Sequence, residues 1–280
     1  MARQALPLGE LTALDRRQCD LGDADQLVSR VRELRPDAIV NAAAYTAVDR
    51  AESDAERAHA VNARAPQLLA EEARRIGAYL VHFSTDYVFD GTKRAPYVES
   101  DEPHPLQVYG RSKLEGERAV RAAGCRHLIL RTSWIYAHRG KNFVLTMLQK
   151  ARTQAKLRVV ADQRGTPTWA FDAATVVANI LRLPELPEGT FHAAAAGETT
   201  WCEFAREIFR LAGLATTVEA VSTAEYPTPS ARPAYTVLDS TLLPRKTGIP
   251  AIGDWKERLS AFDQLKVLRD LGRLAEHDRR

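Results

Sequence analysis

The stretch AYLVHFSTDYVFDG, residues 78–91, decides the fold. It begins as an apolar run and then changes abruptly to hydroxyls and a carboxylate at Ser84, Thr85 and Asp86. A buried strand that ends in polar side chains is typical of a parallel sheet, in which ligands bind beyond the carboxyl ends of the strands. Loop capping by the same side chains is the alternative interpretation.

Similar apolar runs recur along the chain and alternate with helical stretches. The predicted strands are ELTALDR (10–16), DAIVNAAA (37–44), AYLVHFST (78–85), HLILRTSWIY (127–136), LRVVADQ (157–163) and GTFHAAAA (189–196). The predicted helices are Ala63–Gly77, Tyr109–Gly124, Asn142–Ala155 and Phe171–Leu183. This alternation predicts an α/β fold whose parallel sheet is covered by helices on both faces.

The strand over 37–44 ends in three small residues, Ala42, Ala43 and Ala44. Small side chains would let a flat ligand lie close to the backbone. Tight packing of a helix against the strand explains the same pattern equally well, so both interpretations stay open.

The sequence changes character after Asp162. DQRGTPTWAFD is rich in turn residues, and YPTPSARPAYTVLD places Pro227, Pro229 and Pro233 close together, which excludes a regular central strand or helix. We therefore expect a smaller C-terminal lobe that binds substrate. The predicted nucleotide-binding domain is 1–160 completed by 170–196, and the predicted lobe is 161–169 with 197–280.

Composition excludes several classes of protein. The 39 basic and 36 acidic residues are spread along the chain, which disfavours nucleic acid binding. Every apolar run is far shorter than the roughly 18 residues of a membrane span, and no signal-peptide core is present, so a cytoplasmic protein is expected. Cys19, Cys125 and Cys202 and the seven histidines lack metal-binding spacing, so we expect free thiols and no protein metal site.

QVYGRSKLEGE, residues 107–117, places Tyr109 and Lys113 four residues apart. Four residues are one helical turn, so the phenol and the ammonium can meet the same ligand. Ordinary surface residues are the alternative, because this spacing alone is common by chance.

The neighbouring motifs favour catalysis. IVNAAAYTAVDRAE, VNARAPQLLAEEA, HFSTDYVFDG, PLQVYGRSKLEGE, LRTSWIYA, NFVLTML, VVADQRGTPT and YPTPSARPAYTVLD follow one another along the chain. In this order they resemble the extended short-chain dehydrogenase/reductases, and within these the dTDP-4-dehydrorhamnose reductase family, over nearly the whole chain. The resemblance implies a Rossmann-like doubly wound parallel sheet and NAD(P)H-dependent reduction of the C4 keto group of dTDP-4-dehydro-L-rhamnose to dTDP-L-rhamnose.

The resemblance also implies catalytic roles. Tyr109 would protonate the developing alkoxide after hydride transfer, and Thr85 would orient the reacting oxygen. Lys113 would hold the ribose hydroxyls next to the nicotinamide. Its charge is also expected to lower the pKa of the Tyr109 phenol, which is otherwise near 10, toward the working pH.

On the substrate side the resemblance implies contacts from Thr85, Asp86, Trp134, Asn142 and Arg232. A guanidinium matches phosphate oxygens, so Arg232 is the candidate for the diphosphate. Packing between two lobes is the alternative for Trp134, and stapling a loop is the alternative for Arg232.

The chain departs from this family at its beginning. A first strand and a glycine-rich turn should open the fold and carry the cofactor pyrophosphate, but the sequence starts MARQALPLGELTALDRR. We expect the absent strand to lie between the strands at 10–16 and 78–85. Two explanations stay open, an internal methionine as the start of the given chain and a true loss of the segment.

Cofactor choice is the next open question. Asp15 would suit the ribose 2′-hydroxyl of NADH, whereas Arg16 and Arg17 would suit the 2′-phosphate of NADPH, and NADPH is favoured. The other expected cofactor contacts are Asp20 and Leu21 near the adenine, Ala42, Ala43 and Ala44 along its path, and Tyr109 and Lys113.

Two other functions remain possible from the sequence. One is a reductase or epimerase of another nucleotide sugar, and the other is a non-catalytic regulatory subunit on the same fold. Retention of Thr85, Tyr109 and Lys113 counts against the second, because a binding module does not need a proton donor. The expected partner is a small nucleotide sugar, with a monomer or homodimer as the assembly. Mg²⁺ is possible as a further cofactor but has no support in the sequence.

Overall fold

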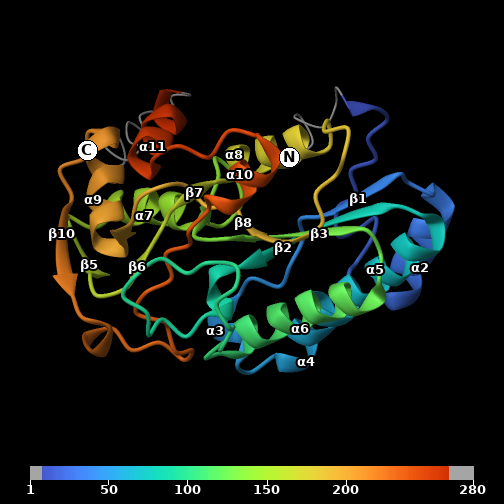
Figure 1. Cartoon of the computed structure of the whole chain (residues 1–280). Helices are drawn as coiled ribbons and strands as arrows, with labels where there is room; N and C mark the ends of the chain where they lie inside the picture. The colour runs from blue at the N-terminus through green and yellow to red at the C-terminus, as the bar shows by residue number, and fades with distance from the viewer. Residues whose placement is uncertain (1–7, 265–280) are drawn as a thin grey trace.

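The computed structural model describes residues 8–264 of the 280-residue chain. Its centre is a four-stranded sheet in the order β1-β2-β3-β8 (Figure 1). The strands are β1 (Ala38–Asn41), β2 (Tyr79–Thr85), β3 (His127–Thr132) and β8 (Gly189–His192). All three pairings between neighbours are parallel, which confirms the predicted class of sheet.

Helices cover both faces of this sheet (Figure 1). Leu80 of β2 packs on one side into a cluster with α2 (Ala24–Leu34), α5 (Ala65–Ile76) and α6 (Val108–Ala123). The next residue, Val81, packs on the other side with α8 (Ala170–Ile180) and α10 (Leu242–Thr247). Consecutive side chains of a strand point to opposite faces, so one apolar run supplies both cores.

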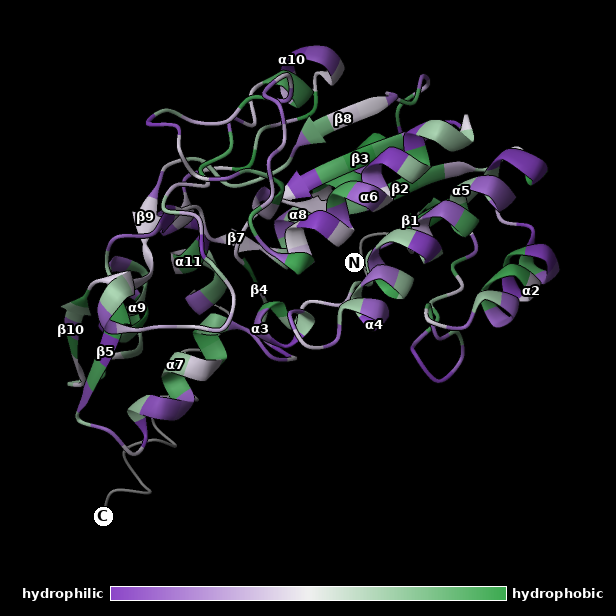
Figure 2. Ribbon diagram, turned by 90° about the horizontal axis from the view of Figure 1, so that it is seen from below, coloured by the Kyte–Doolittle hydropathy of each residue, from purple (hydrophilic) through white to green (hydrophobic). Residues whose placement is uncertain are grey.

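The lobe has a core of its own, at the end of the molecule away from β1 (Figure 2). There β5 (Lys156–Val160) pairs in parallel with β10 (Thr217–Val221), so the strand predicted at 157–163 lies outside the central sheet. The helices of the lobe are α7 (Phe143–Ala151), α9 (Trp201–Ala212) and α11 (Trp255–Gln264). The domain division at residue 160 stays a prediction.

The rest of the described chain forms short elements. Small strand pairs join β4 (Ile135–Tyr136) to β7 (Thr168–Trp169) and β6 (Arg164–Gly165) to β9 (Thr199–Thr200). The remaining helices are α3 (Val48–Ala51), α4 (Ala55–His59), the π-helix η2 (Ala60–Arg64), and the 3₁₀ turns η3 (Asp86–Val88) and η4 (Thr223–Glu225).

The strand predicted at 10–16 is not formed. Leu11 and Leu14 are 38% and 40% exposed, and no strand among residues 8–264 pairs with this segment. An extended segment without a neighbour has no partner for its backbone groups, so it forms no ladder.

The expected place of the absent strand was also wrong. β2 lies between β1 and β3, and its register with β1 runs from Ala38 opposite Tyr79 to Asn41 opposite His82. Within residues 8–264 the sheet has an unpaired edge along β1 instead.

Candidate active site

The carboxyl end of β2 carries two buried polar residues, Thr85 and Asp86. The Thr85 hydroxyl accepts the Tyr87 N–H at 3.2 Å and donates to Asp86 Oδ1 at 3.0 Å. Loop capping and a ligand site, the two interpretations of this stretch, therefore involve the same hydroxyl.

Two glycines let helix α6 approach the turn η3, which follows β2, and the π-helix η2 closely. A Cβ at Gly110 would lie 2.1 Å from the Tyr87 carbonyl oxygen, and one at Gly116 would lie 2.1 Å from the Asn62 carbonyl oxygen. Glu52 Oε1 accepts the Val108 N–H at 3.0 Å and so caps the first turn of the helix. The close approach brings Tyr109 to the end of β2.

Tyr109 is partly exposed, and its phenol lies beside Thr85. Its ring also meets Tyr87 edge-on, with centroids 6.1 Å apart. Burial raises the pKa of Tyr109 to about 12, and the Thr85 contact opposes this shift. The expectation that the pKa lies below its ordinary value was therefore wrong, because burial disfavours the phenolate.

Lys113 is almost fully buried, with 2% of its surface exposed. Its Nζ donates to the Phe83 carbonyl oxygen at 2.5 Å and lies 3.4 Å from His82 Nε2. Burial lowers the pKa of Lys113 to about 8, and the nearby Glu117 carboxylate opposes this shift. The ammonium form therefore predominates at neutral pH.

A buried ion pair supports the helix one turn further on. Arg131 Nε and Nη2 donate to the two Glu117 oxygens at 2.9 and 2.7 Å, and the Ser84 hydroxyl donates to Oε1 at 2.6 Å. Burial alone would raise the pKa of Glu117, but the Arg131 contacts outweigh it and the pKa is lowered. Sequence reasoning missed this pair, although an arginine inside the apolar run HLILRTSW was a signal for it.

The small residues after β1 form an accessible ledge. Ala42 and Ala43 are exposed and Ala44 is partly buried. The exposure of Ala42 and Ala43 leaves room beside the backbone for a flat ligand and argues against tight helix packing at these two positions.

The residues expected near the adenosine lie on the surface. Asp15, Arg16 and Arg17 are exposed, and the Asp15 carboxylate accepts the Arg17 N–H at 2.8 Å. Asp20 is instead paired with Arg57 Nη2 at 2.7 Å.

Leu21 packs partly buried against the core formed by α2, α5 and β2. Asp20 and Leu21 thus have partners within the chain, an ion pair and a hydrophobic contact respectively, and their cofactor contacts stay predictions.

Trp134 follows β3 with an unusual backbone conformation, φ 45°. Its indole stacks on Trp201 of α9, with centroids 3.5 Å apart and planes 8° apart. A Cβ at Gly165 would lie 2.4 Å from the indole, so only glycine leaves space for it. The packing role suggested for Trp134 is therefore present, whereas its contact with substrate stays a prediction.

The other expected substrate residues also have partners within the chain. Arg232 Nη2 donates to Asp49 Oδ1 at 2.8 Å, which ties the proline-rich segment to α3. The Asn142 side chain caps α7 by accepting the Leu145 N–H at 3.2 Å. Burial raises the pKa of Asp86 to about 7, partly countered by hydrogen bonds from threonine side chains.

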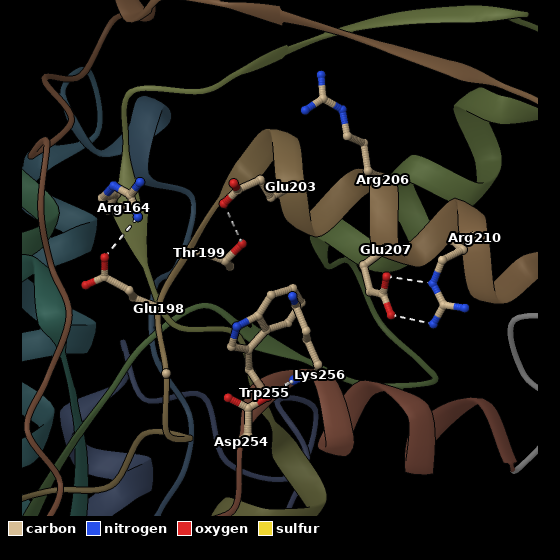
Figure 3. Close-up of a pocket in the computed structure, with 11 residues that line it drawn as sticks. Arg164, Glu198, Thr199, Glu203, Arg206, Glu207, Arg210, Asp254, Trp255 and Lys256 are labelled. Atoms are coloured by element: carbon tan, nitrogen blue, oxygen red, sulfur yellow. Dashed lines mark hydrogen bonds and ion pairs between the residues drawn. The ribbon is translucent and has the colours of Figure 1, made fainter.

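A polar cavity of about 670 Å³ lies in the lobe, between α9 and the start of α11 (Figure 3). Arg164 pairs there with Glu198 at 2.9 Å, and Arg210 pairs with Glu207 at 2.6 Å. None of the expected catalytic, cofactor or substrate residues lines this cavity.

Residues 8–264 lack two other kinds of feature. No helix there is long and apolar enough to span a membrane. No cluster of three histidine, cysteine or acidic side chains there is arranged to hold a metal ion.

The comparisons with known proteins agree with the fold described above. A family model described as the RmlD substrate binding domain matches residues 1–266. The chain belongs to this family. Curated members similar to it are the dTDP-4-dehydrorhamnose reductases of Sinorhizobium fredii and Burkholderia thailandensis, at 46% and 42% identity. Each alignment covers 91% of this chain, and it covers 88% of the first protein and 91% of the second.

Solved structures of the RmlD family share the fold. The dTDP-4-dehydrorhamnose reductase of Bacillus anthracis, in complex with NADP, is 34% identical with a TM-score of 0.89, over 94% of each chain. That of Clostridium acetobutylicum is 39% identical with a TM-score of 0.87, over 92% of this chain and 90% of the other. The Rossmann-like fold and the family implied by the sequence motifs are confirmed.

Proposed function

We propose that this chain uses NADPH to reduce the C4 keto group of dTDP-4-dehydro-L-rhamnose, giving dTDP-L-rhamnose. The observation that carries the proposal is the convergence of Thr85, Tyr109 and Lys113 at the carboxyl end of β2. The printed activity of curated relatives, whose alignments cover 91% of this chain, supports the same reaction.

The proposed chemistry uses the site as follows. When bound, the reduced nicotinamide would supply a hydride to the C4 carbon. Tyr109 donates its phenolic proton to the C4 oxygen, and Thr85 holds that oxygen in line with the phenol. Because burial raises the pKa of Tyr109 to about 12, the phenol remains protonated and able to donate throughout the neutral range.

The residues present fit the nicotinamide half of the cofactor. Ala42 and Ala43 offer an exposed ledge at the end of β1, and the Lys113 ammonium has a third N–H beyond its two contacts. We assign Lys113 to the ribose hydroxyls, and the exposed Arg16 and Arg17 to the 2′-phosphate that distinguishes NADPH. The NADP complex of the Bacillus anthracis relative supports this choice over NADH.

For the sugar nucleotide we assign Asp86 and Trp134 to the sugar side and Arg232 to the diphosphate. Asn142 would act at the rim. The proline-rich segment that contains Arg232 meets α3 through Asp49, beside the small-residue ledge. The proposal keeps the division into a nucleotide-binding domain of 1–160 with 170–196 and a substrate-binding lobe of 161–169 with 197–280, in a monomer or homodimer.

Substitution of the proposed acid tests this function. Tyr109→Phe is expected to lower kcat at least about a hundredfold, because the proton donor acts in the transition state, while Kd for NADPH stays nearly unchanged. The assay follows loss of reduced-cofactor absorbance with dTDP-4-dehydro-L-rhamnose, and calorimetry measures NADPH binding. Tyr226→Phe, at an exposed position of the lobe, is the matched control. A kcat of Tyr109→Phe within about threefold of wild type would refute the assignment.

A further inference from the structure

Strand β2 carries a fully buried imidazole beside the proposed catalytic lysine. His82 is 0% exposed and lies between β1 and α6. Its Nδ1 is 3.1 Å from Asn41 Nδ2, and its Nε2 is 3.4 Å from Lys113 Nζ. The proposed reaction assigns this imidazole no role.

The Lys113 contact selects one tautomer of the ring. A lysine ammonium has only donors, so it needs the lone pair of His82 Nε2, and the ring proton must then sit on Nδ1. Nδ1–H in turn needs an acceptor, so the Asn41 amide must be turned to place Oδ1 where Nδ2 lies; the hydrogen-bond partners decide which of these two atoms faces the ring. The opposite tautomer would direct Nε2–H against the ammonium.

The surroundings of His82 keep the imidazole neutral. Burial and the charge of Lys113 hold the pKa of His82 well below its ordinary value. On α6 the charged neighbour of Lys113 is Glu117, whose carboxylate is paired with Arg131 of β3. Tyr109, one turn earlier on α6, is neutral because burial raises its pKa to about 12. A neutral ring is the state that can accept from the ammonium.

The Lys113 ammonium has two acceptors around it, and the His82 ring is one of them. The Phe83 carbonyl and His82 Nε2 accept two of the three ammonium protons. Removing one acceptor from a buried ammonium disfavours the charged form. The remaining proton is the one that the proposed function directs to the ribose.

We propose that His82 is a positioning residue: held in the Nδ1–H tautomer by the Asn41 oxygen, it accepts from Lys113 and keeps that side chain charged and aimed. This role rests on the proposed function for its catalytic consequence. The Asn41–His82–Lys113 contacts can nevertheless be tested without turnover.

Two spectroscopic measurements test the contacts directly. Long-range ¹H–¹⁵N spectra of histidine-labelled protein report which ring nitrogen of His82 carries the proton, and Nδ1–H is expected. In protein labelled with ¹³C-lysine, the Lys113 Cε signal, identified by its loss in Lys113→Met, gives the pKa of the amine. A wild-type ring protonated at Nε2 would overturn the proposal even if every variant failed to fold.

Substitutions at His82 supply the second test. His82→Leu removes the acceptor and is expected to lower the Lys113 pKa by about one unit, whereas His82→Gln, which can place an oxygen near the Nε2 position, should restore most of it. The matched control is His192→Gln, at another fully buried histidine that contacts Asp239 rather than Lys113. An unchanged Lys113 pKa in His82→Leu would overturn the proposal.

Kinetics separate this proposal from the proposed function. If the reaction is as proposed, the decline of kcat above the Lys113 pKa should move to lower pH in His82→Leu and return toward wild type in His82→Gln. A Lys113 pKa that shifts while kcat keeps its pH profile would overturn the catalytic consequence. If the wild-type protein has no activity on the sugar nucleotide, the proposed function fails, while the tautomer and the Lys113 titration still decide the His82 contacts.

Discussion

Glu117→Gln is expected to destabilise the fold by about 3 to 5 kcal/mol, because it leaves the Arg131 guanidinium buried without a counter-charge. The side chains of Arg131 and Glu117 are 3% and 0% exposed, and two hydrogen bonds of 2.9 and 2.7 Å join them. Solvent therefore cannot replace the lost carboxylate. The Ser84 hydroxyl, which donates to the same carboxylate at 2.6 Å, loses a charged acceptor as well.

Thermal and urea unfolding measure this loss. In a domain of this size each kcal/mol shifts Tm by about 2 to 4 °C, so a fall of roughly 6 to 20 °C is expected. Glu115→Gln is the control, on the same helix but with a half-exposed carboxylate paired to His59, and it should leave stability nearly unchanged. A loss in Glu117→Gln of less than about 1 kcal/mol would refute the reasoning.

Two further measurements separate the charge from the packing. Removing both charges in Glu117→Leu with Arg131→Met should recover part of the stability, since the Arg131 guanidinium no longer lies buried without a counter-charge. The pKa of Glu117 is lowered in the folded chain, so its stabilisation is present above the unfolded pKa and is lost as pH falls through the folded pKa. The difference between wild type and Glu117→Gln should therefore shrink in acid.

Two other substitutions test the substrate side of the site. Trp134→Ala should raise KM for the sugar nucleotide more than Kd for NADPH, although loss of the stack on Trp201 will also lower Tm; equal losses for both ligands would favour packing alone. Asp86→Asn tests the carboxyl whose folded pKa, about 7, lies above its ordinary 3.8. Because the pKa of Asp86 is raised in the folded state, the wild-type fold loses stability as pH rises from about 4 to 7. Asp86→Asn has no such ionisation, so its free energy of unfolding should rise relative to that of wild type by more than about 1 kcal/mol over this range. Urea unfolding at several pH values measures this, and a constant difference would contradict the buried, raised carboxyl.

Sequence motifs and periodicity were enough to predict the class of fold and the identity of the proposed catalytic residues. The apolar runs at 37–44, 78–85, 127–136 and 189–196 each contain a strand of the central sheet. The four predicted helices are present, although α7 ends at Ala151 rather than at 155. Such features depend on neighbours a few residues apart, so they can be read along the chain.

Pairing between strands was harder to predict. The apolar run at 10–16 has the composition of a strand but lacks a partner, and the run at 157–163 pairs with β10 in the lobe. Strand formation needs hydrogen bonds to a second segment, and the sequence of one segment does not identify its partner.

By itself the sequence determined the strands of the central sheet, the four predicted helices and which side chains are available for chemistry, including the one-turn spacing of Tyr109 and Lys113. Only the tertiary structure decided the electrostatics of the site: burial raises the pKa of Tyr109, and Lys113 is directed to Phe83 and His82. The reason is physical. Spacing along the chain determines which side of a helix a side chain faces. The solvation and the hydrogen-bond partners of that side chain depend on residues distant in sequence that the fold brings together.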